Sequence, residues 1–373
     1  MPPPEPHLDL PVWRRAVVKV GSALVAPEGQ GGSDRYLGAI ARFIERSRKA
    51  GREVVLVSSG AVAAGLAIQP GRPRTIPEKQ ALAALGQPLL MAHWSRLLDA
   101  PCAQVLLTHD DLSHRTRYVN ARNTLHELLA RSVLPIVNEN DTVAVDELRV
   151  GDNDNLAAHV ATLVDADLLV IGSDIDGLYE ADPRRQPDAR FIGVVDRVTP
   201  EIHAMAGGAH ASVATGGMRT KLQAAEKATT RGIPTVLVNG TDADALDALA
   251  TGILRGTLFR AQNPPLPARK HWLLHATPTV GRIQVDAGAA DAVCHRGASL
   301  LPSGIVGAEG AFHRGDAVEI TLGDDVLARG IVRFDVREVQ RIAGCQNHQV
   351  QAALGYAHPS TVVVHRDDLV LMG

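Results

Sequence analysis

The chain has 373 residues, more than one ordinary hydrophobic core supports, so two domains are expected. Hydrophobic residues make up 45%, charged residues 21%, and the formal net charge is −3, which describes a soluble globular protein without general attraction for nucleic acid or anionic membranes. Aromatic residues, at 3%, are too scarce to favour base-stacking platforms for nucleic acid.

The N-terminal residues indicate neither secretion nor a membrane anchor. Residues 1–7 are rich in proline and lack the basic and apolar regions of a signal peptide. No later segment has about 18 uninterrupted apolar residues. Cys102, Cys294 and Cys345 are far apart and have no metal-binding spacing, which indicates reduced thiols. We therefore expect a cytoplasmic protein whose residues 1–13 are a disordered tail.

The first predicted strand contains an unusual lysine. Residues 15–20, RAVVKV, form an apolar run before the turn at Gly21, as in a buried strand. Lys19 interrupts this run, and a charge inside a buried strand is costly unless it is paired or lies near the strand end. The alternative is an edge strand from which the lysine reaches solvent.

Helical and strand patterns then alternate over about 250 residues. The predicted helices are residues 35–50, 80–98, 120–131, 156–163 and 222–231, and the predicted strands are residues 53–57, 104–108, 133–137, 167–172 and 234–239. Pro135 suggests that its strand lies at a sheet edge or that the proline lies at the strand start. The alternation predicts an α/β domain, a three-layer αβα sandwich with a mostly parallel central sheet.

Turns rich in glycine and small residues follow several of these strands. Residues 58–65, SSGAVAAG, would let a ligand approach backbone N–H groups, although close helix packing explains the pattern equally well. Residues 215–221, TGGMRTK, open a helix and supply Lys221. Neither G-x-x-x-x-G-K-[ST] nor a strand-to-helix G-x-G-x-x-G is present, so any nucleotide site must be built differently.

Two polar clusters lie at the expected ligand-binding edge of the sheet. Residues 138–141, NEND, follow a predicted strand, and residues 152–155, DNDN, precede a predicted helix. One or two of the DNDN residues would be enough to cap that helix, so the surplus indicates a site. Two lysines, many backbone donors and a few carboxylates are the groups that phosphoryl transfer requires.

The C-terminal part of the sequence has a different pattern. Residues 263–271 contain several prolines and charges, which is typical of a linker. Short alternating runs with turns then predict a small β-rich domain or barrel; these runs are residues 281–286, 315–320, 326–334 and 361–365. The predicted organisation is a tail at residues 1–13, a catalytic domain at 14–262, a linker at 263–275 and a second domain at 276–373.

Six ordered motifs resemble those of the glutamate 5-kinases, a family of the amino acid kinase superfamily. They are VKVG at residues 18–21, VSSGAVAAG at 57–65, VNEND at 137–141, VGDNDN at 150–155, GLYEADPR at 177–184 and TGGMRTK at 215–221. Six motifs in this order are far more specific than any single one. The segment from about residue 276 resembles the PUA domain that many glutamate 5-kinases carry.

The resemblance implies a role for each matching residue. Lys19 and Lys221 would stabilise the γ-phosphoryl group of ATP during transfer, and Asp154 would orient both lysines. L-Glutamate would be held by Ser59, Gly60, Asn138, Asp141 and Asn153. ATP would be bound by Lys19, Gly21, Ser173, Asp174, Thr215, Gly216, Gly217, Met218, Arg219, Thr220 and Lys221. Asp152 and Asn155 would be left to cap the helix.

The implied reaction is attack of the glutamate γ-carboxylate on ATP, giving γ-glutamyl 5-phosphate and ADP, the first step of proline biosynthesis. The nucleophile is ionised at neutral pH, so no general base is required. Mg²⁺ would be carried mainly on the ATP phosphates, with no protein-built metal site. The resemblance also implies feedback inhibition by proline, a homo-oligomer (dimer or tetramer), and hand-over of the product to a glutamyl phosphate reductase.

Three alternatives remain from the sequence. Another amino acid kinase could act on a different carboxylate, such as aspartate. An RNA-binding protein could use the PUA-like domain, but residues 276–373 contain eight Arg, no Lys and eleven Asp plus Glu, a net charge of −3. A non-catalytic amino-acid sensor would be expected to lack the two lysines, and both are present.

Overall fold

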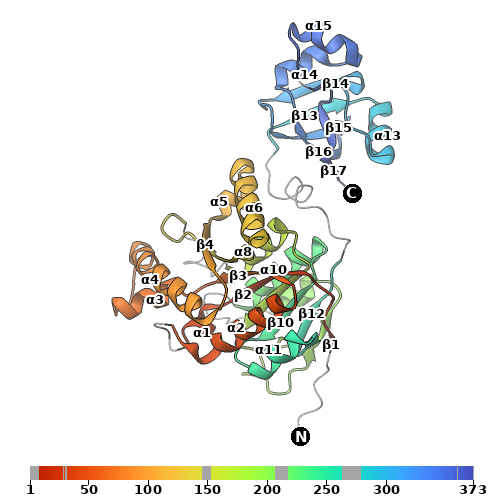
Figure 1. Cartoon of the computed structure of the whole chain (residues 1–373). Helices are drawn as coiled ribbons and strands as arrows, with labels where there is room; N and C mark the ends of the chain where they lie inside the picture. The colour runs from red at the N-terminus through yellow and green to blue at the C-terminus, as the bar shows by residue number, and fades with distance from the viewer. Residues whose placement is uncertain are drawn as a thin grey trace. The chain divides into compact units, whose positions relative to one another are not determined.

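The computed structural model describes residues 8–27, 29, 32–144, 153–205, 217–262, 279–358 and 360–372 (Figure 1). The chain divides near residue 266 into two compact units, and each is described by itself. Across these ranges, no helix combines the length and the apolar character needed to cross a membrane.

The first unit is built on an eight-stranded sheet. In spatial order its strands are β4 (Cys102–Leu107), β5 (Leu134–Glu139), β3 (Glu53–Ser58), β2 (Arg15–Val20), β6 (Leu168–Ser173), β10 (Thr235–Asn239), β12 (Gly256–Phe259) and β9 (Val194–Val195). Neighbouring strands from β4 to β10 are parallel, and β12 is antiparallel to β10. The parallel strands end at one edge, so the polar residues after β2, β3, β5 and β6 meet there.

Helices cover both faces of this sheet, which confirms the predicted αβα layers (Figure 1). Helices α2 (Asp34–Lys49) and α11 (Ala243–Ala250) share one face, and α8 (Asn153–Leu163) and α10 (Met218–Thr230) share the other. The other helices are α1 (Ser22–Val25), α3 (Ala61–Ile68), α4 (Ile76–Leu97), α5 (His109–Ser113), α6 (Arg115–Ala130) and α9 (Pro200–Met205).

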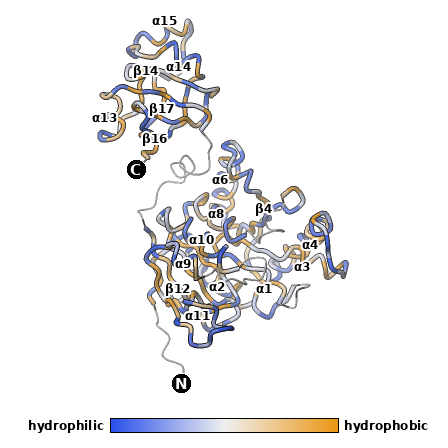
Figure 2. The backbone as a smooth tube through the Cα atoms, turned by 180° about the vertical axis from the view of Figure 1, so that it is seen from behind, coloured by the Kyte–Doolittle hydropathy of each residue, from blue (hydrophilic) through white to orange (hydrophobic). Residues whose placement is uncertain are grey.

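The alternation of β2 decides where its lysine points. Ala16, Val18 and Val20 belong to the apolar core that includes α2 and α11. Because successive strand residues face opposite ways, Lys19 faces α8 and α10. On α2 the buried residues recur every three or four positions, so its apolar stripe faces the sheet and its polar residues face outward (Figure 2).

Both edge-strand alternatives are wrong. β2 lies in the middle of the sheet, and β5 lies between β4 and β3. Pro135 is the second residue of β5, and pairing of β5 with β3 begins only at Ile136. Leu134 donates its backbone N–H to Pro101 on the β4 side, so the nitrogen of Pro135 faces β3, where no pairing has begun. The missing N–H therefore costs no bond of this sheet.

Short strands complete the first unit, and one corrects the predicted tail. Leu8–Asp9 form β1, which pairs antiparallel with β11 (Ile253–Leu254). Leu10 and Trp13 are buried in the main core. The expectation of disorder is therefore wrong for residues 8–13. A further pair, β7 (Leu178–Tyr179) with β8 (Phe191–Ile192), lies outside the main sheet.

The second unit is β-rich, as predicted. Its five strands, in the order β14 (Ile305–Gly310), β13 (Gly281–Val285), β15 (Ala317–Leu322), β16 (Asp325–Val332) and β17 (Val364–Leu371), form one sheet. Its helices are α13 (Ala287–Arg296), α14 (Val336–Ile342) and α15 (Val350–Leu354). β14 and the three helices were not predicted, and β17 begins three residues later than the predicted strand. Residues 263–278, which hold the predicted linker, lie outside the described ranges.

Helices α3 and α4 pack with direct backbone contact because two glycines face each other. A Cβ atom added at Gly65 would lie 2.1 Å from the carbonyl oxygen of Leu82. A Cβ atom added at Gly86 would lie 1.9 Å from the carbonyl oxygen of Ala61. No side chain fits at such distances, so these glycines set how closely α4 approaches the start of α3.

Replacement of Gly86 by alanine is expected to destabilise the first unit, although alanine favours helices. The added methyl group must separate α3 from α4, which should cost about 2–3 kcal/mol, in the range of overpacking substitutions. Thermal and urea unfolding of the full chain measure the effect. Gly71→Ala is the matched control, because a Cβ atom there meets nothing within 4 Å. Equal stability of the two variants would show that the helices do not need this close contact.

Candidate active site

Three buried charged side chains meet at the edge where β2 ends. The Lys19 Nζ atom lies 2.6 Å from Asp154 Oδ1, and the Lys221 Nζ atom lies 3.4 Å from Asp154 Oδ2. The side chains of Lys19, Asp154 and Lys221 are 4%, 0% and 9% exposed. They come from β2, the first turn of α8 and the first turn of α10. The fold thus joins residues that are far apart in the sequence into one ion-paired cluster, defined here as the lysine–aspartate cluster.

The electrostatics of the cluster keep its carboxylate ionised. Burial by itself would raise the pKa of Asp154, but Lys19, Lys221 and a hydrogen bond from Thr220 together hold that pKa below its ordinary value. Thr220 Oγ1 donates to Asp154 Oδ2 at 2.7 Å. Burial lowers the pKa of Lys221, against the attraction of Asp154. Two ammonium groups therefore share one carboxylate, which leaves an excess of positive charge for a phosphate group.

A neutral network continues from this cluster through the next residue of α8. Asn153 Nδ2 donates to Ser59 Oγ at 2.8 Å and to Asn138 Oδ1 at 2.9 Å. All three side chains are buried, and they lie at the ends of β3 and β5 and in the first turn of α8. Gly60, with a φ of 109°, turns the chain from β3 into α3. Asp141, which is also buried, follows β5.

The predicted nucleotide residues lie at the ends of β2 and β6 and at the start of α10. A Cβ atom at Gly21 would lie 3.4 Å from Lys19 Nζ, so the turn after β2 touches the lysine–aspartate cluster. Ser173 is the last residue of β6, and its hydroxyl donates to Asp174 at 3.3 Å. Asp174 also attracts Lys221, although Arg184 Nη2 donates to Asp174 at 3.0 Å. Burial would raise the pKa of Asp174, but hydrogen bonds and Arg184 lower it overall.

The first turn of α10 supplies the remaining nucleotide residues. Gly217 precedes the helix in extended conformation, and Met218, Arg219 and Thr220 form its first turn together with Lys221. The backbone N–H groups at such a helix start attract phosphate oxygens. Thr215 and Gly216 lie outside the described residues.

Sequence comparisons agree with this geometry. Residues 14–239 match the amino acid kinase family, and residues 281–354 match the PUA domain. The chain is 63% identical over 370 residues to the glutamate 5-kinase of Salinibacter ruber, a match that covers 97% of this chain and 98% of the relative. The chain belongs to the glutamate 5-kinase family. It is also 53% identical to the glutamate 5-kinase of Xylella fastidiosa strain M12, over 100% of this chain and 99% of the relative, and 51% identical to that of Idiomarina loihiensis, over 98% and 99%.

One capping prediction for the DNDN cluster of this glutamate 5-kinase family member is wrong. Helix α8 begins at Asn153, so Asn155 is its third residue and is buried inside the first turn. A residue in that position cannot act as the N-cap. Asp152 lies outside the described residues, and its capping role stays a prediction.

Helix α4 supplies polar residues that the sequence analysis missed. Trp94 is fully buried and donates its indole N–H to Ser58 Oγ at 2.9 Å. Gln87 Oε1 accepts from Asn138 Nδ2 at 3.0 Å. The buried residues of α4 are Leu82, Ala83, Gly86, Gln87, Leu90 and Trp94. Gln87 is the polar side chain that interrupts this helically spaced apolar stripe, and that was the available sequence signal.

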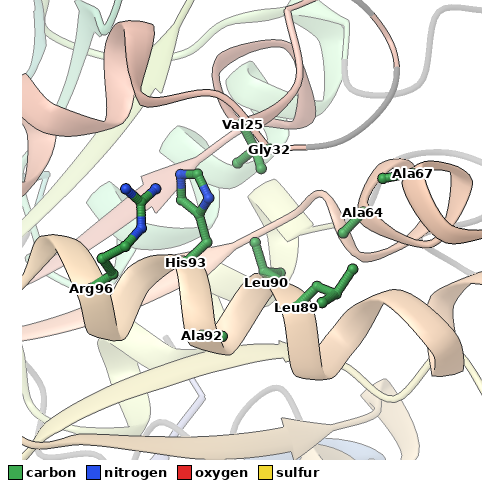
Figure 3. A pocket seen from close by; sticks show the side chains of 9 residues that line it. All are labelled: Val25, Gly32, Ala64, Ala67, Leu89, Leu90, Ala92, His93 and Arg96. Atoms are coloured by element: carbon green, nitrogen blue, oxygen red, sulfur yellow. The ribbon is translucent and has the colours of Figure 1, made fainter.

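A separate cavity of about 330 Å³ lies between α1, α3 and α4 (Figure 3). Val25, Ala64 and Leu90 give it an apolar wall, and His93 and Arg96 project from α4 at one end. Both polar residues pair with Asp34, at 2.9 Å and 2.8 Å. Burial lowers the pKa of His93, which Asp34 opposes. None of the predicted site residues lines this cavity, so it is distinct from the polar cluster at the sheet edge.

Proposed function

We propose that this chain transfers the γ-phosphoryl group of ATP to the γ-carboxylate of L-glutamate. A γ-carboxylate oxygen forms the new bond to the γ-phosphorus, the bond from that phosphorus to the β–γ bridging oxygen breaks, and ADP leaves with the electron pair. The products are γ-glutamyl 5-phosphate and ADP. The observation that carries the proposal is the adjacency of Asn153 and Asp154, which joins the neutral network to the lysine–aspartate cluster.

Lys19 and Lys221 are assigned to the phosphoryl group. Charge spreads over its oxygens during transfer, and two positioned ammonium groups neutralise this charge without reorganisation. Asp154 holds both ammonium groups in place through its two carboxylate oxygens. The glutamate γ-carboxylate is already ionised at neutral pH, so the site needs no general base.

The neutral network is assigned to glutamate. Ser59, Asn138 and Asn153 offer hydroxyl and amide donors that suit substrate carboxylates, and the turn at Gly60 adds backbone N–H groups. Asp141 offers a carboxylate that suits the substrate ammonium group. These groups are buried, which strengthens each polar contact once water is excluded.

ATP is assigned to the remaining part of the site. Gly21, Ser173, Asp174, Gly217, Met218, Arg219 and Thr220 surround the lysine–aspartate cluster, and Thr215 and Gly216 are included from the motif alone. Asp154 is already shared by two lysines, so the described residues fit Mg²⁺ carried on the ATP phosphates better than a protein-built magnesium cage.

The wider biological assignments follow from family membership. We infer that this is a cytoplasmic homo-oligomer, a dimer or tetramer, that takes part in proline biosynthesis, is inhibited by proline and hands its product to a glutamyl phosphate reductase. The acidic composition of residues 276–373 favours no nucleic-acid partner for the PUA domain. Cross-linking, analytical ultracentrifugation and inhibition assays would test these assignments one by one.

An ATP-dependent hydroxamate assay tests the proposed reaction. Hydroxylamine traps an acyl phosphate, so glutamate with ATP and Mg²⁺ should give the γ-hydroxamate, and omission of ATP should abolish it. Aspartate, one methylene shorter, should react at least about tenfold more slowly, as expected for misplacement of the attacking carboxylate. A product from aspartate alone, or from neither amino acid, would contradict the assignment.

A further inference from the structure

The polar member of the buried stripe on α4 lies beside the proposed glutamate site. Gln87 is 7% exposed, and its neighbour Gly86 lets α4 touch the start of α3 through the backbone. This close packing brings Gln87 to the end of β5, where its side chain contacts Asn138. The position is therefore set by backbone packing, and it leaves the Gln87 side chain little freedom to move.

The orientation of the Gln87 amide follows from its neighbours. The backbone N–H of Glu139 donates to a side-chain atom of Asn138 at 2.9 Å, so that atom must be the oxygen. The Asn138 amide nitrogen then faces Gln87, and the Gln87 atom facing it, at 3.0 Å, must be the oxygen Oε1. Gln87 Nε2 points away from Asn138, and this buried nitrogen has no hydrogen-bond partner among the residues that the structure describes.

A buried amide N–H₂ group without an acceptor is costly, so an acceptor supplied by a ligand is the natural partner. Substrate carboxylates are strong acceptors for such a donor. Asn153 connects Gln87, through Asn138, to Asp154 and the lysines. Gln87 is thus at the end of this chain of side chains that is remote from the phosphoryl-transfer cluster. The carboxylate that reaches Gln87 is accordingly the one that is not phosphorylated.

We propose that Gln87 is a further substrate-binding residue, whose Nε2 group donates a hydrogen bond to the α-carboxylate of the amino acid substrate. The inference rests on the proposed function, because it assumes an amino acid with two carboxylates in the site. It gives Gln87 two simultaneous tasks, since Oε1 positions Asn138 while Nε2 holds the substrate.

Gln87→Glu separates the two tasks. The new carboxylate still accepts from Asn138 but no longer donates, and it repels the α-carboxylate. The KM for glutamate should rise about 10- to 100-fold, the range for loss of a hydrogen bond to a charged group, while the KM for ATP and kcat stay within about threefold. Gln69→Glu, the same change at an exposed position after α3, is the matched control and should leave all three parameters unchanged.

Gln87→Met provides a second, uncharged test in case the glutamate variant does not fold. This variant should weaken glutamate binding about tenfold but leave the inhibition constant of 4-aminobutyrate, which has no α-carboxylate, unchanged. A merely structural role through Asn138, or a buried water as the acceptor of Nε2, would weaken both ligands equally and leave Gln87→Glu close to wild type; either result would overturn the inference alone. Wild-type protein that neither binds nor phosphorylates glutamate would contradict the proposed function as well.

Discussion

Replacement of Lys221 or Lys19 by alanine is expected to lower kcat by a factor of about 10² to 10³, the range for loss of one positioned transition-state donor. Each variant removes one of the two ammonium groups that Asp154 holds, but the other ion pair remains. The charge that develops on the transferred phosphoryl group then has a single lysine to neutralise it. Hydroxamate formation under saturating ATP and glutamate measures kcat directly.

Lys49→Ala is the control for these two variants. Lys49 is exposed, and its 3.7 Å ion pair with Asp99 is also exposed, so the same change of charge should leave kcat unaltered. Unfolding midpoints should be compared in parallel, because a loss of kcat counts only if the first unit remains folded. A kcat within threefold of wild type in both Lys19→Ala and Lys221→Ala would remove the lysines from the mechanism.

Replacement of Asp154 by asparagine is expected to impair both activity and stability. The volume is conserved, but two buried ammonium groups lose their only carboxylate in the cluster, which should cost about 3–5 kcal/mol of unfolding free energy. The pKa of Lys221, which burial already lowers, should fall further, so this lysine loses part of its charge. Denaturant unfolding and the hydroxamate assay measure the two effects. The exposed variant Asp247→Asn, which removes an ion pair with Arg46, should cost less than about 1 kcal/mol.

The same carboxylate predicts a pH dependence of stability. The pKa of Asp154 in the folded protein is lower than its model value of 3.8, so the folded state binds this proton less well than the unfolded state does. Its contribution to stability is therefore present above about pH 4 and is lost as the pH falls through the folded pKa. The difference in stability between wild type and Asp154→Asn should shrink in acid. A constant difference from pH 7 to pH 3 would show that Asp154 is not held ionised by its lysines.

The sequence by itself determined the order of the strands and helices in the first unit and the identity of the site residues. Apolar runs of period two or 3.6 are local properties, and β3, β6, β10, α2 and α10 therefore formed close to where the patterns indicate. The lysine inside the apolar run of β2 marked a buried charge that needed a partner.

Only the tertiary structure decided how these residues are used. Pairing of Lys19 with Asp154 spans 135 positions, and it depends on strand register and on which face α8 covers, neither of which is a local property. Pro135 is tolerated inside the sheet because pairing on its side begins one residue later. Gln87 belongs to no motif and is brought to Asn138 by glycine-mediated contact between α3 and α4. Long-range packing, which no window of sequence contains, therefore completes the site that the motifs only begin.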